Sequence, residues 1–267
     1  ATDFRRLAGL DSDQFTSTSE PPMSQPARTA IVTGASRGFG RAISAALVAT
    51  GAHVVGVARD QHELDAVRAE LGDAFTPVAA DATDENLASQ LIHEHRSNLL
   101  VLNAGATPHL APIHEHTWDT FSRNWQVDTK HAFGWLKAAL REPLAPGSVV
   151  VAISSGAALA GSPLSGGYAS ANAAIRYLRN YAADEANRAE LGIRFVTLLP
   201  QLTPSGVGET GVAGYAAREG IPVEAFVERM APVLTPELLA KAVVEVAADP
   251  DSATEYQVGG AGPRVLA

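Results

Sequence analysis

Short apolar runs alternate with longer amphipathic stretches over most of the chain, from residue 29 onward. The run at 29–33 is apolar at its three central positions and ends at a glycine, which is typical of a strand buried on both faces. Stretches with apolar residues at helical spacing end at Gly51 and Gly72, because glycine commonly terminates a helix. We expect strands at 29–33, 53–58, 76–80, 99–102, 148–153, 194–199 and 256–258, and helices at 41–50, 61–71, 84–95, 117–140, 168–188 and 236–248.

This alternation predicts the fold class. Strands that are apolar throughout need cover on both sides, so we expect an α/β fold, a Rossmann-type doubly wound parallel sheet with helices on both faces. A length of 267 residues suits one large domain, which we place at 29–267. Residues 1–28 are polar and interrupted by prolines, and they are predicted to form a flexible N-terminal extension.

Residues 203–235 interrupt the regular alternation. Glycine and proline are concentrated at 203–222, directly after a strand whose carboxyl end should lie at the ligand crevice. A mobile lid over the substrate fits this position, and an ordinary surface loop is the alternative.

Composition and charge narrow the classes of partner. The chain is 46% hydrophobic and 18% charged, which is typical of a globular protein, and a net charge of −9 argues against a nucleic-acid partner. It contains no cysteine, so disulfides and thiolate metal sites are excluded. The histidines at 93 and 95, and at 114 and 116, lack a matching carboxylate set, so we expect no metal site. No apolar run reaches the roughly 18 residues of a membrane helix, and we expect a cytoplasmic protein without a membrane partner.

The segment Thr33-Gly-Ala-Ser-Arg-Gly-Phe-Gly40 carries the clearest chemistry, between the first predicted strand and the first helix. Gly34 allows a tight turn, Gly38 lets backbone amides approach a pyrophosphate, and Gly40 permits close packing of the helix. A dinucleotide site is therefore predicted, and a merely structural turn is the alternative. The contact residues expected in this segment are Gly34, Ser36, Arg37, Gly38, Phe39 and Gly40.

Two arginines decide which nicotinamide cofactor is predicted. An NAD site usually places an acidic residue at the end of the second strand, where it binds the ribose 2′-OH. Here that strand ends at Arg59, and Asp60 follows. Arg59 and Arg37 present cations suited to a 2′-phosphate, so we predict NADP(H) in preference to NAD(H). The alternative is that both arginines are solvated surface charges.

These motifs stand in the order found in the short-chain dehydrogenase/reductase family, and residues 29–262 resemble that family. The resemblance implies further cofactor contacts at Asp81, Ala82, Asn103, Gly105, Pro200 and Thr203. Asp81 would contact the adenine amino group, and the segment at 103–105 would flank the adenosine ribose. The family commonly pairs two long helices, here 117–140 and 168–188, so the resemblance implies a homodimer or homotetramer.

The resemblance also implies an active site of Asn, Ser, Tyr and Lys, from which this chain departs at two positions. Ser155 lies 13 residues before Tyr168, at the family's spacing, but Asp128 stands in place of the Asn and Asn172 in place of the Lys. By resemblance, the tyrosine protonates the substrate oxygen, the serine hydrogen-bonds that oxygen, and the lysine lowers the tyrosine pKa. Without that cation, reduction stays possible, whereas oxidation, in which the tyrosine acts as a base, should suffer.

Arg176 offers a replacement cation. Tyr168, Asn172 and Arg176 are spaced four residues apart, so we expect them roughly along one helix face, and one hypothesis is that Arg176 extends a cation toward the ribose or Asp128. The alternative is that Arg176 pairs with Asp128 or caps surface structure without taking part in the chemistry.

Three functions remain open. The leading hypothesis is an NADP(H)-dependent carbonyl reductase or alcohol dehydrogenase of the short-chain type, slow or biased in direction, that acts on a neutral small molecule. The second is a cofactor-binding protein without redox turnover that serves as a scaffold or sensor. The third is a lyase or isomerase that uses the same pocket, with Asp128 as the base.

Overall fold

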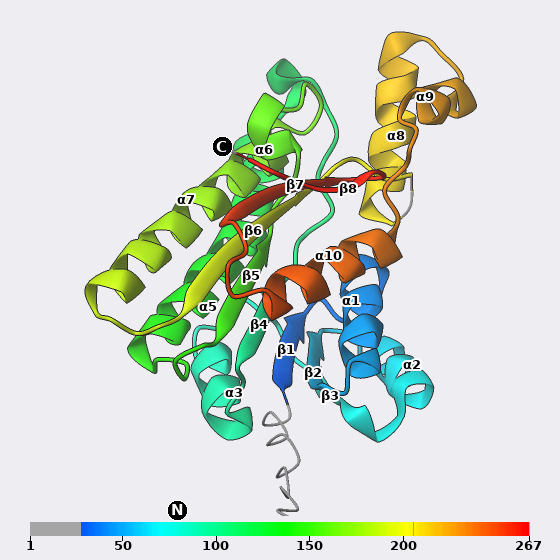
Figure 1. The fold of residues 1–267 in the computed structure, drawn as a ribbon. Coiled ribbons are helices and arrows are strands. Elements are labelled where there is room, and N and C mark those ends of the chain that lie inside the picture. The colour runs from blue at the N-terminus through cyan, green and yellow to red at the C-terminus, as the bar shows by residue number, and fades with distance from the viewer. Residues whose placement is uncertain (1–27, 205, 267) are drawn as a thin grey trace, which may run out of the picture.

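A computed structural model describes residues 28–204 and 206–266, and the predicted extension lies outside them except for Arg28. Within the described residues, eight strands form one sheet in the order β3-β2-β1-β4-β5-β6-β7-β8 (Figure 1). The strands are β1 (Thr29–Thr33), β2 (His53–Ala58), β3 (Phe75–Ala79), β4 (Leu99–Leu102), β5 (Val149–Ile153), β6 (Arg194–Pro200), β7 (Glu255–Gly259) and β8 (Gly262–Val265).

Helices connect the parallel strands. They are α1 (Gly38–Ala49), α2 (Gln61–Leu71), α3 (Leu87–His95), α4 (Trp118–Asn124), α5 (Lys130–Arg141), α6 (Ala157–Ala160), α7 (Gly166–Arg188), α8 (Val207–Glu219), α9 (Val223–Arg229) and α10 (Pro236–Ala248), with short turns η1 (Gly72–Ala74), η2 (Ile113–Glu115) and η3 (Trp125–Thr129). In the part of the chain that the structure describes, none of these helices combines the length and apolar character that a membrane span requires.

The strand order confirms the predicted doubly wound architecture. β1 lies between β2 and β4, so the chain winds outward in both directions from the centre of the sheet. One strand that the sequence did not predict, β8, adds to the edge of this sheet and pairs antiparallel with β7. β8 begins directly after the turn with Gly262 at φ +98°, a left-handed conformation that glycine adopts without strain.

Two apolar layers cover the sheet. Alternate strand residues such as Ala30 and Val32 pack against α1 and α10 on one face, whereas Ile31 and Leu100 belong to a second cluster with α3, α5 and α7. Figure 1 shows α10 and α1 together on one side of the sheet, with α5 and α7 adjacent to each other. The fully apolar strands are therefore explained by burial on both faces, as predicted.

The predicted helix at 117–140 exists but is interrupted. A π-helical turn, η3, separates α4 from α5, and its residue Asp128 is buried. Such turns are rare and occur mostly at functional sites. Sequence periodicity did not predict this interruption, since a single wider turn shifts the apolar pattern by only one residue.

The predicted mobile lid at 203–235 contains two helices, α8 and α9, which lie together at the upper right in Figure 1. Its glycines suggested a loop, but Gly208, Gly211 and Gly214 are spaced three apart and lie within α8. An added Cβ at Gly208 would lie 2.0 Å from the Thr203 carbonyl oxygen, and one at Gly214 would lie 3.1 Å from Leu110. These glycines therefore permit close packing of a helix.

Candidate functional site

The glycine loop leaves β1 with its backbone in conformations that favour glycine. Gly34 and Gly38 have φ values of +68° and +53°. The Gly34 amide donates to the Val57 carbonyl at 2.8 Å, and an added Cβ at Gly40 would lie 2.0 Å from the Gly34 carbonyl oxygen. No heavy atom lies within 4 Å of the corresponding point at Gly38. The loop is therefore packed from behind and open in front, which fits the approach of a pyrophosphate to its amides.

Asn103, the residue directly after β4, supports this loop. Its backbone amide donates to the Thr33 hydroxyl at 2.9 Å, and its side-chain amide donates to the Thr33 carbonyl at 3.0 Å and the Gly34 carbonyl at 3.3 Å. The structure thus brings Asn103 to the predicted site, where its side chain fixes the turn from behind. Phe39 packs against the apolar core with its ring half-buried.

The adenosine end of the predicted site carries one carboxylate that sequence reasoning missed. Ser36 donates a 2.7 Å hydrogen bond to Glu63, whereas Arg37 and Arg59 are exposed. Asp60 caps α2 by accepting from the Glu63 amide at 3.0 Å. The sequence does hold a signal for this contact, since Glu63 lies in the first turn of the helix that follows β2. A short loop and one helical turn bring its side chain back to the glycine segment.

Asp81 and Ala82 follow β3 and lie beside α5. The Asp81 carboxylate accepts from the Thr83 amide and hydroxyl, each at 2.9 Å, and these bonds hold its pKa below the usual value. The Ala82 carbonyl accepts from the Trp135 indole at 3.0 Å. His131 is buried against Trp135, and burial lowers its pKa to about 4, although the negative charge of Asp81 acts in the opposite direction. This imidazole is therefore neutral near pH 7.

Tyr168 lies in the first turn of α7, half-buried beside Ser155, which follows β5. Burial raises the pKa of the Tyr168 phenol, the Ser155 hydroxyl lowers it, and the charge of Asp128 raises it again. The Ser155 hydroxyl also accepts from the Ala157 amide at 3.2 Å. Ser155 and Asp128 therefore both lie close enough to Tyr168 to affect the pKa of its phenol, so the structure brings three of the four predicted catalytic side chains together.

Asn172 completes the predicted set but carries no charge. Its side chain is buried and donates to the Tyr168 carbonyl at 3.0 Å, one turn back along α7. Its own carbonyl accepts from the Ser154 hydroxyl at 3.0 Å. Asn172 therefore fixes the backbone at Tyr168, and it supplies no cation to the phenol.

Arg176 pairs with Glu255, so the hypothesis that it supplies a replacement cation is not supported. Its guanidinium donates to both carboxylate oxygens of Glu255 on β7, at 2.7 and 2.5 Å. Eight residues along an α-helix correspond to about 800° of rotation, so Arg176 is turned by about 80° from Tyr168. Two residues spaced by four lie on one face of a helix, but the offset accumulates when the spacing is repeated. Arg176 is therefore directed to Glu255 on the sheet.

Asp128 is held in the η3 turn with 3% of its surface exposed. It accepts from the Ala106 amide at 2.7 Å and from the side chain of Asn124 at 2.9 Å. Burial raises its pKa to about 6, and these two hydrogen bonds oppose the shift. Because its carboxylate also lies 3.2 Å from the position of an added Cβ at Gly105, the carboxyl sits directly against the 103–105 segment.

Pro200 and Thr203 lie at the end of β6, as the motif order predicts. The Pro200 carbonyl accepts from the Gly156 amide at 2.8 Å, which ties this strand end to the segment after Ser155. The Thr203 hydroxyl donates to the Leu234 carbonyl at 2.8 Å. These contacts connect the base of the predicted lid to the active-site edge of the sheet.

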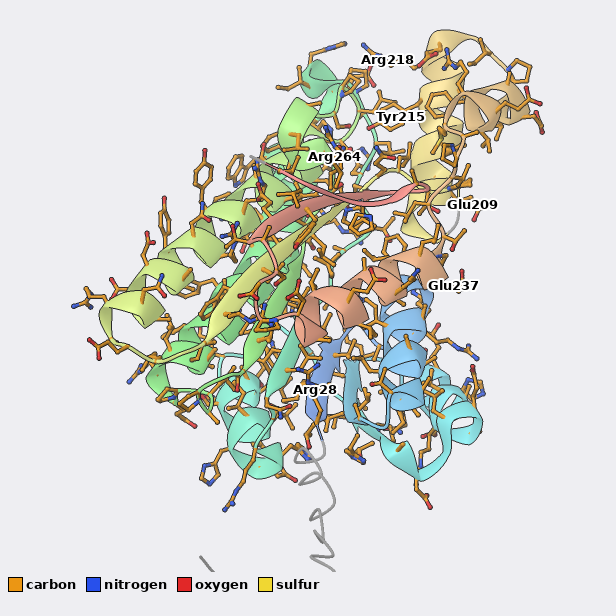
Figure 2. The ribbon with its side chains drawn as sticks, viewed as in Figure 1. Arg28, Glu209, Tyr215, Arg218, Glu237 and Arg264 are labelled. Atoms are coloured by element: carbon orange, nitrogen blue, oxygen red, sulfur yellow. The ribbon has the colours of Figure 1, made fainter. Side chains whose placement is uncertain are left out.

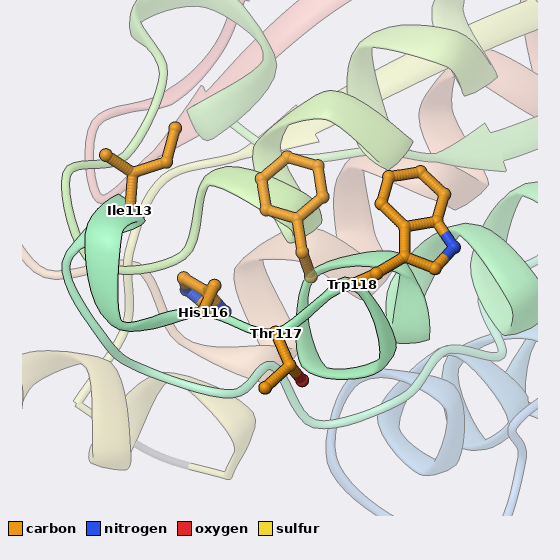
Figure 3. A pocket seen from close by; sticks show the side chains of 5 residues that line it. Ile113, His116, Thr117 and Trp118 are labelled. Carbon is orange, nitrogen blue, oxygen red and sulfur yellow. The ribbon is translucent and has the colours of Figure 1, made fainter.

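A separate cavity of about 280 Å³ lies before and within α4 (Figure 3). Its lining residues are Ile113, His116, Thr117, Trp118 and Phe121. None of them is a predicted site residue. Among the described residues, no group of three His, Asp or Glu side chains is placed to hold a metal ion.

Known proteins resemble both the sequence and the fold. A family model described as short chain dehydrogenase matches residues 28–213. The chain is 28% identical over 201 residues to a sorbitol dehydrogenase of Cereibacter sphaeroides, a match that covers 73% of this chain and 78% of that protein. It is 30% identical over 181 residues to an L-xylulose reductase of Bos taurus, covering 67% and 74%. The solved structure of NAD⁺-bound xylitol dehydrogenase has a TM-score of 0.76 at 20% identity, over 87% of this chain and 98% of that one, and this similarity confirms the fold.

Proposed function

This chain belongs to the short chain dehydrogenase family, and we propose that it is an NADP(H)-dependent oxidoreductase of the carbonyl reductase or alcohol dehydrogenase type. The observation that carries the proposal is the Tyr168 phenol, half-buried beside Ser155 and under the influence of Asp128. The open glycine loop supports the cofactor assignment, and the exposed arginines at 37 and 59 favour a 2′-phosphate. The cytoplasmic location stays a prediction.

The residues present suit reduction better than oxidation. A bound nicotinamide supplies the hydride. Tyr168 holds its proton at neutral pH, because burial raises a pKa that is already far above 7, so it can donate that proton to a substrate oxygen. Ser155 stands close enough to the phenol to donate a hydrogen bond to the same oxygen. These two hydroxyls orient a carbonyl and stabilise the charge that develops on it.

Oxidation would require Tyr168 to lose its proton, which the surrounding charges oppose. Asn172 brings no cation, and Asp128 is ionised above pH 6, where its negative charge further disfavours a phenolate. General acid–base assistance contributes roughly 10²–10⁴-fold to such steps. We therefore expect measurable reduction and an oxidation rate lower by a factor within that range.

The test is the oxidation of NADPH across a panel of small neutral ketones and aldehydes, and of NADP⁺ with the matching alcohols. Asn172→Lys should raise alcohol oxidation more than carbonyl reduction, because a cation near Tyr168 stabilises the phenolate. Asn180→Lys, an exposed position on the same helix, is the control. Equal effects of both substitutions in both directions would contradict the proposed role of the charge.

A second candidate is a protein that binds the cofactor without redox turnover. The observation that favours it is the amide of Asn172, which donates to the Tyr168 carbonyl and leaves the phenol without a cation. Tight NADPH binding without turnover, together with turnover gained in Asn172→Lys, would support this candidate and contradict the first. A lyase or isomerase that uses Asp128 as a base is disfavoured, since both of its carboxylate oxygens already accept hydrogen bonds.

We also propose that the protein forms a homodimer or homotetramer through α5 and α7. Exposed aromatic side chains lie on the two helices and the adjoining η3 turn: Trp125, Phe133, Tyr177 and Tyr181 are each at least 50% exposed. Large exposed apolar groups of this kind often mark an interface. Light scattering of Phe133→Asp should show a smaller particle than the native chain, and an unchanged mass would contradict the interface.

A further inference from the structure

Three hydroxyl groups meet next to the catalytic tyrosine. Ser162 and Ser165, in the loop before α7, lie 2.7 Å apart at their hydroxyl oxygens, and the Ser165 amide donates to the Ser162 hydroxyl at 3.0 Å. The phenol of Tyr215, from α8, contacts the Ser162 hydroxyl and lies 3.4 Å from that of Ser165. We call these three side chains the hydroxyl cluster.

The hydroxyl cluster adjoins the start of α7, which carries Tyr168. Ser165 is the N-cap residue of α7 and comes three residues before Tyr168. Figure 2 shows Tyr215 on the side of α8 that faces the α6 and α7 region. The neighbouring Gly214 is in contact range of Leu110 and Leu164, so apolar side chains adjoin the cluster. A substrate held at Tyr168 would therefore meet one apolar wall and one group of hydroxyls.

Tyr215 is held in place by packing on its far side. Its ring stacks on Phe226 of α9, with ring centroids 6.3 Å apart and an interplanar angle of 14°. The lid helices thus fix the position of the phenol, while Ser162 and Ser165 fix its hydroxyl. A group that is held in this way recognises a partner at a small cost in conformational entropy.

The chemistry of the cluster points to a hydroxylated substrate. Each hydroxyl can donate one hydrogen bond and accept two, and none of the three carries a charge at neutral pH. A substrate hydroxyl can replace one member of the cluster as the partner of the others, whereas a methyl group at the same place would leave polar atoms unpaired. A substrate carboxylate would meet no compensating cation among these groups.

We propose that the hydroxyl cluster binds a second hydroxyl of the substrate, so that Tyr215 selects carbonyl compounds carrying a hydroxyl group beside the reacting carbonyl. This inference rests on the proposed carbonyl reduction and adds the substrate class. Sites that hydrogen-bond a substrate hydroxyl reject analogues that lack it much more strongly than apolar pockets reject an added group. A preference of at least about fivefold for the hydroxylated compound is expected, since one unpaired buried group costs about 1–3 kcal/mol.

The experiment compares acetoin with methyl isopropyl ketone, in which a methyl group replaces the hydroxyl. Both are titrated calorimetrically into protein saturated with the 1,4,5,6-tetrahydro analogue of whichever cofactor, NADPH or NADH, it binds. This analogue exchanges no hydride with either the carbonyl or the acetoin hydroxyl, so only binding is measured. The native protein should bind acetoin at least about fivefold more tightly. Tyr215→Phe should lose most of that preference by weakening acetoin alone.

Tyr256→Phe is the matched control. Tyr256 lies on β7, and its phenol oxygen accepts from the Ala253 amide at 2.7 Å and, among the described residues, from no member of the cluster. This variant should keep the native preference, and Ser162→Ala should reduce it in the same direction as Tyr215→Phe. Equal affinity for the two ketones in the native protein, or an unchanged preference in Tyr215→Phe, would overturn the inference. Ketone binding with the expected preference but no NADPH oxidation would instead count against the proposed reductase function and leave the binding assignment standing.

Discussion

The glycine loop at 33–40 and the tyrosine site around Tyr168 both lie at the carboxyl edge of the sheet, yet they are built differently. The shape of the loop is set by its backbone, because Gly34 and Gly38 have positive φ and the Gly34 carbonyl occupies the space beside Gly40. At the tyrosine site, the protonation of the Tyr168 phenol depends on side-chain charge, which the buried Asp128 supplies and Asn172 lacks. Cofactor binding thus depends on shape, while catalysis depends on charges that can change without moving the backbone.

The largest effect on cofactor affinity is expected in the glycine loop, where binding depends on the shape of the backbone. Gly40→Ala would place a Cβ 2.0 Å from the Gly34 carbonyl oxygen, so the loop or α1 must shift. Overpacking of this kind costs about 1–3 kcal/mol of folding stability. Displaced amides would also lose hydrogen bonds to the pyrophosphate, and two such bonds correspond to at least about 100-fold in affinity. Fluorescence titration with NADPH and thermal unfolding measure the two effects.

Ala49→Ser provides the control, because it also adds one atom to α1 but at an exposed position. It should change the cofactor affinity by less than about twofold. If Gly40→Ala bound NADPH with native affinity, the loop would not be the pyrophosphate site. The statement that cofactor binding depends on the backbone shape of this loop would then be contradicted.

The same contrast explains what the sequence could predict. The strands and the glycine loop follow from local rules, such as burial on both faces and glycine at positive φ, so residues 29–33 and Gly34 were placed correctly. The α8 helix was missed, because its glycines resemble a loop until the contact with Leu110 is known. Contacts between distant segments, such as Ser36 with Glu63, are set by packing that no short motif encodes.

A charge-based prediction concerns two buried groups on neighbouring turns with opposite pH dependences. The pKa of Asp128 is raised to about 6, so its contribution to stability is present below pH 3.8 and is lost as the pH rises through 6. The pKa of His131 is lowered to about 4, so its contribution is present above pH 6.5 and is lost as the pH falls through 4. Near pH 5, the two contributions change at about 1 kcal/mol per pH unit with opposite signs and nearly cancel.

Asp128→Asn should uncover the His131 contribution. Relative to the native protein, its free energy of unfolding should rise with pH between 4.5 and 6, by a total of about 1–2 kcal/mol. The Ala106 amide can still donate to the new side chain, but the bond from Asn124 is lost, so the slope is more informative than the absolute stability. Urea unfolding at several pH values measures it, and a slope equal to that of the native protein would contradict the pKa of about 6 at Asp128.

His131→Gln should show the reverse. Without the imidazole, the free energy of unfolding relative to the native protein should fall as the pH rises from 4.5 to 6, by a similar amount. The absolute stability is expected to change as well, since the His131 ring packs edge-on against Trp135. If both variants shift the slope in the same direction, then the two buried groups do not oppose each other, and the cancellation expected near pH 5 is contradicted.

The smallest effect is expected at Glu63, where a side-chain charge enters the region otherwise governed by shape. Its carboxylate is held 2.7 Å from the Ser36 hydroxyl, and it offsets the cations at 37 and 59 that favour a 2′-phosphate. Glu63→Gln should therefore raise the affinity for NADPH relative to NADH by up to about fivefold, the upper end of the range for a charge interaction that solvent screens. Glu70→Gln on the same helix, which removes the partner of Arg41, is the control and should leave the ratio of the two dissociation constants unchanged. A ratio that shifts toward NADH in Glu63→Gln would mean that Glu63 does not repel the 2′-phosphate, and that the cofactor region depends on shape alone.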